Sequence, residues 1–220
     1  TPRATAGGRS GRGASGHATF AAILRRLPDG SRVLLAGQKS GMFHALDPDH
    51  AGAMRWQKRL SPGGVLGGIE WGFAADEQHV FVPISDVWEN KTSPGHAGGL
   101  YALNLADGSD YWNVPAAKPD CLDRAGCNAG QPAAATLIPG VVFSASMDGH
   151  LRAYDSADGR IVWDVDTKRD YQTVNGVPAH GGSIKGAGVT VVNGWVYAGS
   201  GYGLWGMPGN VFLAFGPKAK

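Results

Sequence analysis

The sequence is poor in charged residues and contains no long apolar run. Only 17% of its 220 residues are Asp, Glu, Lys or Arg, and the formal net charge is +2, whereas about 25% charged residues is typical of soluble domains. A transmembrane helix needs about 18 or more consecutive apolar residues, and no such stretch occurs. Beyond residue 32 there is no stripe of lysine and arginine. We therefore expect no membrane span and no nucleic-acid partner.

Helix-forming patterns are also scarce. Apolar residues do not recur with the period of an amphipathic helix, and 35 glycines and 13 prolines disfavour long helices. Apolar area for a core is nevertheless available, because 43% of the residues are hydrophobic and seven are tryptophan. The composition predicts a folded chain without long helices and excludes wholesale disorder.

The first residues differ in composition from the rest. Residues 1–32 carry six arginines and one aspartate, and residues 1–19 show no apolar periodicity. We expect 1–22 to be a basic, Gly/Arg-rich disordered lead-in at the edge of a fragment, and 23–220 to be the folded domain. A secretory signal has an apolar core of about 7–15 residues, and we expect no signal peptide in this chain.

One segment recurs four times along the chain. Each copy has a glycine, an alternating strand with a central alanine and, in three copies, a tryptophan further on. The alanines that mark the four copies are Ala45, Ala102, Ala153 and Ala214. They lie 57, 51 and 61 residues apart. Each copy follows an apolar strand, and we place these strands at 33–36, 79–84, 141–145 and 195–198. Self-similarity at such a period is typical of repeat architectures.

The turn residues indicate how each unit folds. Asp148-Gly149 and Asp158-Gly159 flank the alternating stretch 151–154, a pattern typical of antiparallel hairpins. The predicted unit is a strand, a tight turn, a second strand, another turn and a third strand that carries the tryptophan. Units of this kind predict an all-β fold, a partial β-propeller of about four antiparallel blades. An ordinary β-sandwich is the alternative.

The tryptophans have a structural role in this prediction. Their large apolar area suits contacts between neighbouring blades, and the three blade-docking candidates are Trp56, Trp112 and Trp163. Four blades are half of a probable eight-bladed ring, so we infer a C-terminal fragment of a longer propeller. Open blade edges would favour self-association.

The repeat also carries a family resemblance. The pattern Ala-x-Asp-x-x-x-Gly-x-x-x-Trp is complete at Ala153, Asp155, Gly159 and Trp163. It resembles the tryptophan-docking repeat of quinoprotein alcohol dehydrogenases, which depend on pyrroloquinoline quinone (PQQ). The stretches 37–47, 67–72, 142–154 and 174–184 look most like the polyvinyl-alcohol dehydrogenase branch of that family.

The resemblance implies a periplasmic or secreted bacterial enzyme with PQQ on the propeller axis. Such an enzyme oxidises an alcohol, polyvinyl-alcohol-like or related, and passes electrons to a c-type cytochrome. It also implies calcium, with ligands in N-terminal blades that this chain lacks, so we expect no metal ligand here. Non-enzymatic propellers share the tryptophan repeat, so a periplasmic scaffold or binding module is the alternative.

Five residues match the family's cofactor pocket, namely Lys39, Glu70, Trp71, Gln131 and Asn175. Lys39 follows a strand, and a cation there would stabilise negative charge on the reduced quinone; a solvated loop lysine is the alternative. The family has an amide where Glu70 stands, which puts its role in doubt. Trp71 is equally well explained as a docking or core aromatic. The Asn175-Gly pair is also typical of an ordinary turn.

The catalytic residue is unknown. Relatives carry an aspartate shortly before the strand that corresponds to Ile23, where it accepts the alcohol proton. The segment 13–20 holds no carboxylate, and His17 is the alternative base. Because the composition of 1–22 differs from everything that follows, we expect it not to be authentic family sequence, and we expect the isolated chain to be inactive.

Two further patterns need an interpretation. Cys121 and Cys127 are the two cysteines, and a disulfide between them would fit an oxidising compartment; two free thiols are the alternative. Gly201, Gly203 and Gly206 match a dinucleotide-binding fingerprint. A turn and a strand follow instead of the helix that such a site requires, so we reject this match.

Overall fold

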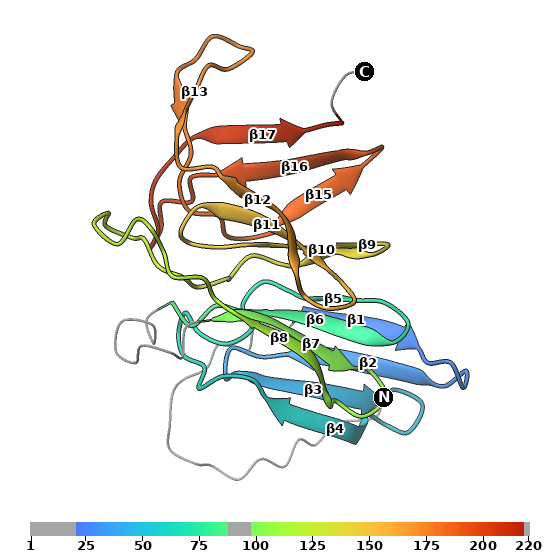
Figure 1. Ribbon diagram of the computed structural model, residues 1–220. Coiled ribbons are helices and arrows are strands. Elements are labelled where there is room, and N and C mark those ends of the chain that lie inside the picture. The colour runs from blue at the N-terminus through green and yellow to red at the C-terminus, as the bar shows by residue number, and fades with distance from the viewer. Residues whose placement is uncertain (1–20, 88–97, 218–220) are drawn as a thin grey trace, which may run out of the picture.

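A computed structural model describes residues 21–87 and 98–217 of the protein. Over these residues the chain forms 17 β-strands and no helix (Figure 1). All the strand pairs are antiparallel. Consistent with this, none of the described residues forms a helix that is long and apolar enough to cross a membrane.

Four sheets follow one another along the chain. Blade 1 contains β1 (Ala21–Arg26), β2 (Arg32–Gly37), β3 (Met42–Asp47) and β4 (Ala53–Arg59). Blade 2 contains β5 (Ala74–Ala75), β6 (His79–Ile84), β7 (Gly99–Asn104) and β8 (Asp110–Pro115). Blade 3 contains β9 (Thr136–Ile138), β10 (Val141–Ala145), β11 (His150–Asp155) and β12 (Ile161–Asp166). Blade 4 contains β15 (Val189–Val192), β16 (Trp195–Ser200) and β17 (Val211–Phe215). A separate hairpin, β13 (Asp170–Tyr171) with β14 (Ala179–His180), lies between blades 3 and 4 in the sequence.

The first strands of the four sheets lie together at the inner side of the blades. Contacts join β1 to β5, β5 to β9 and β9 to β15, so the innermost strands of successive sheets lie next to one another. Figure 1 shows blades 1 and 2 in the lower half of the molecule and blades 3 and 4 in the upper half. The fold is therefore the predicted partial β-propeller of four antiparallel blades, and the β-sandwich alternative is wrong.

The strands predicted from the apolar pattern are present. β6 and β10 have the predicted bounds, and β2 and β16 extend the predicted strands by one or two residues. The predicted three-strand unit lacks one element, because each sheet begins with a further, innermost strand. The innermost strands of blades 2 and 3 are short, with two residues in β5 and three in β9, so no alternating pattern marks them in the sequence.

The tryptophans lie between neighbouring sheets. Trp56 of blade 1 donates its indole N–H to the Leu105 carbonyl of blade 2 at 2.9 Å. Trp112 of blade 2 donates to the Ser156 carbonyl of blade 3, also at 2.9 Å. The Trp163 ring packs edge-on against Phe215 of blade 4, 5.1 Å between ring centroids. Each indole thus contacts the next sheet along the chain, and the aromatic pair of Trp163 with Phe215 contributes about 0.5–1.5 kcal/mol beyond its buried area.

The N-terminal boundary of the folded part differs slightly from the prediction. Strand β1 begins at Ala21, so residues 21 and 22 belong to blade 1 and pair with β2. Residues 1–20, which include His17 and most of the predicted lead-in, lie outside the described residues.

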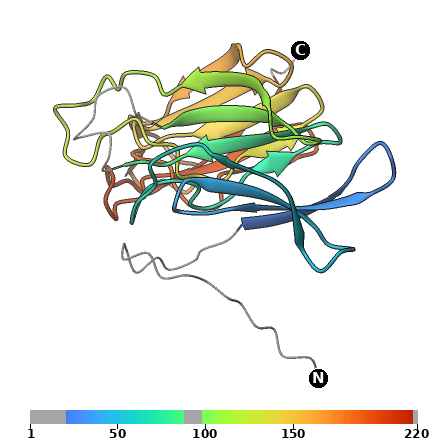
Figure 2. The ribbon, with the colours of Figure 1, turned by 90° about the horizontal axis from the view of Figure 1, so that it is seen from below.

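Alternate connections lie at the same end of an antiparallel sheet. The connections after β2, β4, β8, β10, β12 and β16 therefore share one face, which we call the long-loop face. Figure 2 shows these loops gathered at the left of the molecule. The opposite face has short turns, such as that between β7 and β8. The long-loop face carries most of the residues expected to bind a cofactor.

Candidate functional site

Three charged side chains meet on the long-loop face. Lys39 follows β2, Glu70 precedes β5 and Lys185 precedes β15, so blades 1, 2 and 4 each contribute one of them. The Glu70 carboxylate oxygen Oε1 lies 3.2 Å from Nζ of Lys185 and 3.5 Å from Nζ of Lys39. Two ammonium groups thus share one oxygen. We call these residues the Lys–Glu–Lys site.

The neighbouring loop segments hold Glu70 in place. Its other oxygen, Oε2, accepts a hydrogen bond from the Ser85 hydroxyl at 3.2 Å. Just before it, the backbone N–H of Ile69 donates to the Gln38 carbonyl at 3.1 Å, which ties the segment to the end of β2. The carboxylate of Asp86 accepts the N–H of Gly68 at 2.7 Å. Gly68 has a φ of +63°, a conformation that glycine adopts without strain.

The three side chains of the Lys–Glu–Lys site carry a surplus of positive charge among themselves, with the buried carboxylate of Asp86 bound to Gly68 nearby. Only 6% of the Glu70 side chain and 4% of the Lys185 side chain are exposed, against 25% for Lys39. One carboxylate can neutralise one ammonium, so the three groups together carry one net positive charge. A partly desolvated charge of this kind attracts an anionic ligand more strongly than the same charge in water.

The other predicted cofactor residues are placed differently. Trp71 is 48% exposed beside Glu70. Gln131 is buried, and its carbonyl oxygen accepts a hydrogen bond from the Ser144 hydroxyl at 2.6 Å. Asn175 lies in the exposed loop of the β13–β14 hairpin, which projects away from the blades in Figure 1. The structure therefore joins Lys39 to Glu70 and leaves the neighbouring Trp71 half-exposed. Gln131 is buried next to Ile84, whose carbonyl accepts its N–H at 2.9 Å, and Asn175 lies in the exposed hairpin loop.

Sequence reasoning missed Lys185, although a positional signal existed. Glu70 and Lys185 both stand four residues before the innermost strand of their blade, since β5 begins at Ala74 and β15 at Val189. An alignment of the repeats on their innermost strands would have placed the two residues at equivalent positions. Those strands were the element that the sequence pattern did not reveal.

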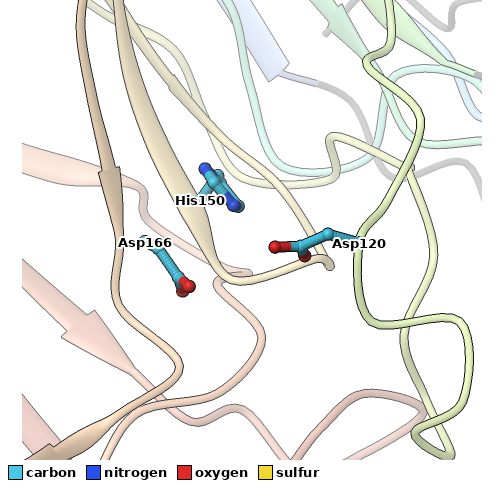
Figure 3. Close-up of side chains that lie close together, drawn as sticks. All are labelled: Asp120, His150 and Asp166. Carbon is cyan, nitrogen blue, oxygen red and sulfur yellow. The ribbon is translucent and has the colours of Figure 1, made fainter.

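A second charged cluster lies at blade 3. Asp120, His150 and Asp166 each offer a ligand atom, and these atoms lie within 4.8 Å of one another (Figure 3). Nζ of Lys168 lies 2.8 Å from Asp120, 2.9 Å from Asp166 and 3.3 Å from His150. The lysine ammonium contacts all three groups, so it occupies the position that a metal ion would need.

The titration behaviour of this cluster follows from those contacts. Burial alone would lower the pKa of Lys168, but its hydrogen bonds to Asp120 and Asp166 outweigh that effect and raise the pKa above its ordinary value. The hydrogen bond from Lys168 lowers the pKa of Asp120 below 3.8. The pair links the loop before β9 to the end of β12.

Blade 3 also contains a buried ionic network. Arg152 donates to the carboxylates of Asp148 at 3.2 Å and Asp164 at 3.1 Å. Burial raises the pKa of the neighbouring Tyr154 to about 12, despite the opposing charge of Arg152. Asp148 also caps the turn after β10, since it accepts the N–H of His150 at 3.0 Å. The role of Asp148 is therefore structural, since it belongs to this network within blade 3.

The remaining motifs of the sequence are structural in this fold. Cys121 and Cys127 are joined by a disulfide and pack with Met207 in one buried cluster. Residues 201–206, which match the dinucleotide fingerprint, lie in an irregular connection between β16 and β17. Without a helix N-terminus there is no place for a pyrophosphate.

Comparison with known proteins places the chain in a family. The PQQ_2 family model, described as outer membrane protein assembly factor BamB, matches residues 39–180. The chain belongs to the PQQ_2 family. Its blades, repeats and docked tryptophans are those of a PQQ-type propeller, and the resemblance to quinoprotein alcohol dehydrogenases is confirmed by the relatives.

Two relatives are polyvinylalcohol dehydrogenases. That of a Pseudomonas species is 44% identical over 209 residues, which is 90% of this chain and 32% of the relative. That of Sphingopyxis sp. (strain 113P3) is 42% identical, over 91% of this chain and 32% of the relative. The quinohemoprotein alcohol dehydrogenase ADH-IIG of Pseudomonas putida is 26% identical over 90% of this chain and 27% of its own length. This PQQ_2 chain thus spans about a third of the length of the curated relatives it matches.

A designed protein of known structure resembles the chain in fold. The computationally designed Ika4 protein is 12% identical with a TM-score of 0.56, and 94% of each chain is covered. BamB from Moraxella catarrhalis is 22% identical with a TM-score of 0.48, over 81% of this chain and 46% of that protein.

Proposed function

We propose that this chain is part of a PQQ-dependent alcohol dehydrogenase that oxidises polyvinyl alcohol or a related alcohol. The observation that carries the proposal is the 44% identity to a polyvinylalcohol dehydrogenase over 90% of the chain. The position of Lys39 supports it, because the lysine expected at the quinone lies in a charged site between the blades rather than in solvent.

The residues of the site fit the chemistry of PQQ. The cofactor is a planar quinone with several carboxylates, so it needs cations and an aromatic or flat surface. Lys39 would contact a quinone oxygen, and the half-exposed indole of Trp71 offers a plane against which the ring can lie. When bound, PQQ would accept the electrons removed from the alcohol. Glu70 would keep Lys39 in position, and the positive charge of Lys39 would stabilise the reduced quinone.

The remaining roles belong to the same proposal. Gln131 and Asn175 stay candidate cofactor contacts on the strength of the resemblance, although Gln131 would have to share its amide with Ser144. We place calcium and the proton-accepting residue in other blades of a longer protein, and a c-type cytochrome as its electron acceptor. The disulfide suits a periplasmic or secreted protein.

A second candidate function is a scaffold or binding module without cofactor. The match of residues 39–180 to a family model described as an outer membrane protein assembly factor favours it. A scaffold without cofactor has no need to bind PQQ. Binding of PQQ therefore separates the two candidates.

The test is a calorimetric and absorbance titration of the 220-residue chain with PQQ. We expect saturable binding, and Lys39→Met should weaken it by about tenfold or more, as expected for a lost charge-assisted hydrogen bond. Exposed Lys118→Met is the matched control and should bind like the wild type. A dye-linked alcohol oxidation assay with PQQ and calcium should show no turnover by the chain alone. Failure of the wild type to bind PQQ would support the scaffold.

A further inference from the structure

Lys185 is the most buried charge of the Lys–Glu–Lys site, yet it also borders an open pocket. The pocket has a volume of about 370 Å³ and lies along blade 4, between Lys185 and the ends of β16 and β17. Tyr202 and Phe212 are among the residues that line it, and no carboxylate is among its described lining residues. The most buried charge of the site therefore belongs to a residue that lines this cavity, while its acidic partner Glu70 lies outside the described lining.

The walls of the pocket suit a flat ligand. Phe212 is 73% exposed, and the Tyr202 ring centroid lies 5.5 Å from Nζ of Lys185. Gly199 forms part of the wall, and a Cβ atom at that position would meet nothing within 4 Å. The pocket thus offers one cation, two aromatic rings and an open glycine surface.

The charge balance indicates what the cation would bind. Glu70 is the acidic partner of both Lys39 and Lys185, and it cannot neutralise both. An anionic group in the pocket would supply the missing negative charge, and it would meet an ammonium already stripped of most of its water.

We propose that Lys185 is a second cationic contact of the site and binds a carboxylate of a planar aromatic ligand in this pocket. If the proposed function holds, that ligand is PQQ, with Lys39 at a quinone oxygen and Lys185 at a carboxylate. Glu70 is then a positioning residue. It orients the two lysines and reduces their combined charge from +2 to +1.

Opposite effects of two substitutions test this proposal. Lys185→Met keeps the length of the side chain and removes its charge, so it should weaken the binding of PQQ by roughly 10–100-fold. Glu70→Gln keeps the shape and removes the negative charge, so it should strengthen binding by roughly 3–10-fold. If Glu70 and Lys185 served only to hold the blades together, both variants would weaken binding. Lys118→Met is again the control.

A second ligand separates this inference from the proposed function. The same variants are titrated by calorimetry with PQQ and with pyridine-2,6-dicarboxylate, and circular dichroism checks that each is folded. Binding of the dicarboxylate that depends on Lys185, without binding of PQQ, would sustain the anion site and refute the PQQ assignment. Equal PQQ binding by wild type and Lys185→Met would overturn the role of Lys185 and leave the proposed function intact. Absence of binding to both ligands would overturn both.

Discussion

Replacement of Gly159 by alanine tests how the blades are held together. Gly159 lies in the turn between β11 and β12, with a φ of +75°. A Cβ atom added there would lie 2.8 Å from Cε3 of Trp112 and 2.8 Å from Cγ2 of Val114, both in blade 2. Gly140 has a similar φ of +81°, but nothing lies within 4 Å of an added Cβ. The two glycines therefore differ in the contact with the next blade and not in the backbone.

The magnitude follows from that difference. The left-handed backbone destabilises each alanine variant by about 1–2 kcal/mol. Only Gly159→Ala is further destabilised by overpacking, by about 1–3 kcal/mol in a close-packed interior. For a domain of this size 1 kcal/mol lowers the melting temperature by about 2–4 °C. Gly159→Ala should therefore melt roughly 2–12 °C below Gly140→Ala.

The measurement is thermal unfolding of both variants, followed by near-ultraviolet circular dichroism. The excess destabilisation should shrink in a Trp112→Leu background, because most of the opposing ring is then gone and the two sites are coupled. Equal melting temperatures for Gly159→Ala and Gly140→Ala would refute the packing of the Trp112 indole against this turn.

Two further substitutions test the charges of blade 3. The pKa of Asp120 in the folded protein lies below its ordinary 3.8, so its pairing with Lys168 stabilises the fold fully above that value and is lost as the pH falls through the lowered pKa. Because Asp120 is largely exposed, Asp120→Asn should lower the melting temperature by at most about 4 °C near pH 7. The difference in melting temperature between wild type and variant should vanish near pH 2. An equal difference at both pH values would contradict the charge effect. Arg152→Met leaves the buried carboxylate of Asp148 without its cation and should cost about 3–5 kcal/mol in urea unfolding. Exposed Arg160→Met is the control and should cost less than about 1 kcal/mol; equal losses for the two arginine variants would show that the buried pair contributes nothing special.

Much of the fold could be predicted because its signals are local. Strand β10 has the predicted bounds since it begins directly after the turn glycine at 140 and its five residues are all apolar or small. The recurrence of alanine, glycine and tryptophan predicted blades, since each tryptophan must find an apolar neighbour one repeat further on. The innermost strand of blade 2 escaped prediction, because β5 has only two residues and its place is decided by contacts with β1 and β9.

The candidate sites depended on contacts over long distances in the sequence. Lys39 and Glu70 could be named from a motif, but no local pattern connects either of them with Lys185, which lies 115 residues beyond Glu70. The same is true of Lys168, whose ammonium lies between Asp120 and Asp166. Sequence periodicity thus determines which segments become strands and blades. The angle between blades, which only packing sets, decides which loop residues meet and which charges find a partner.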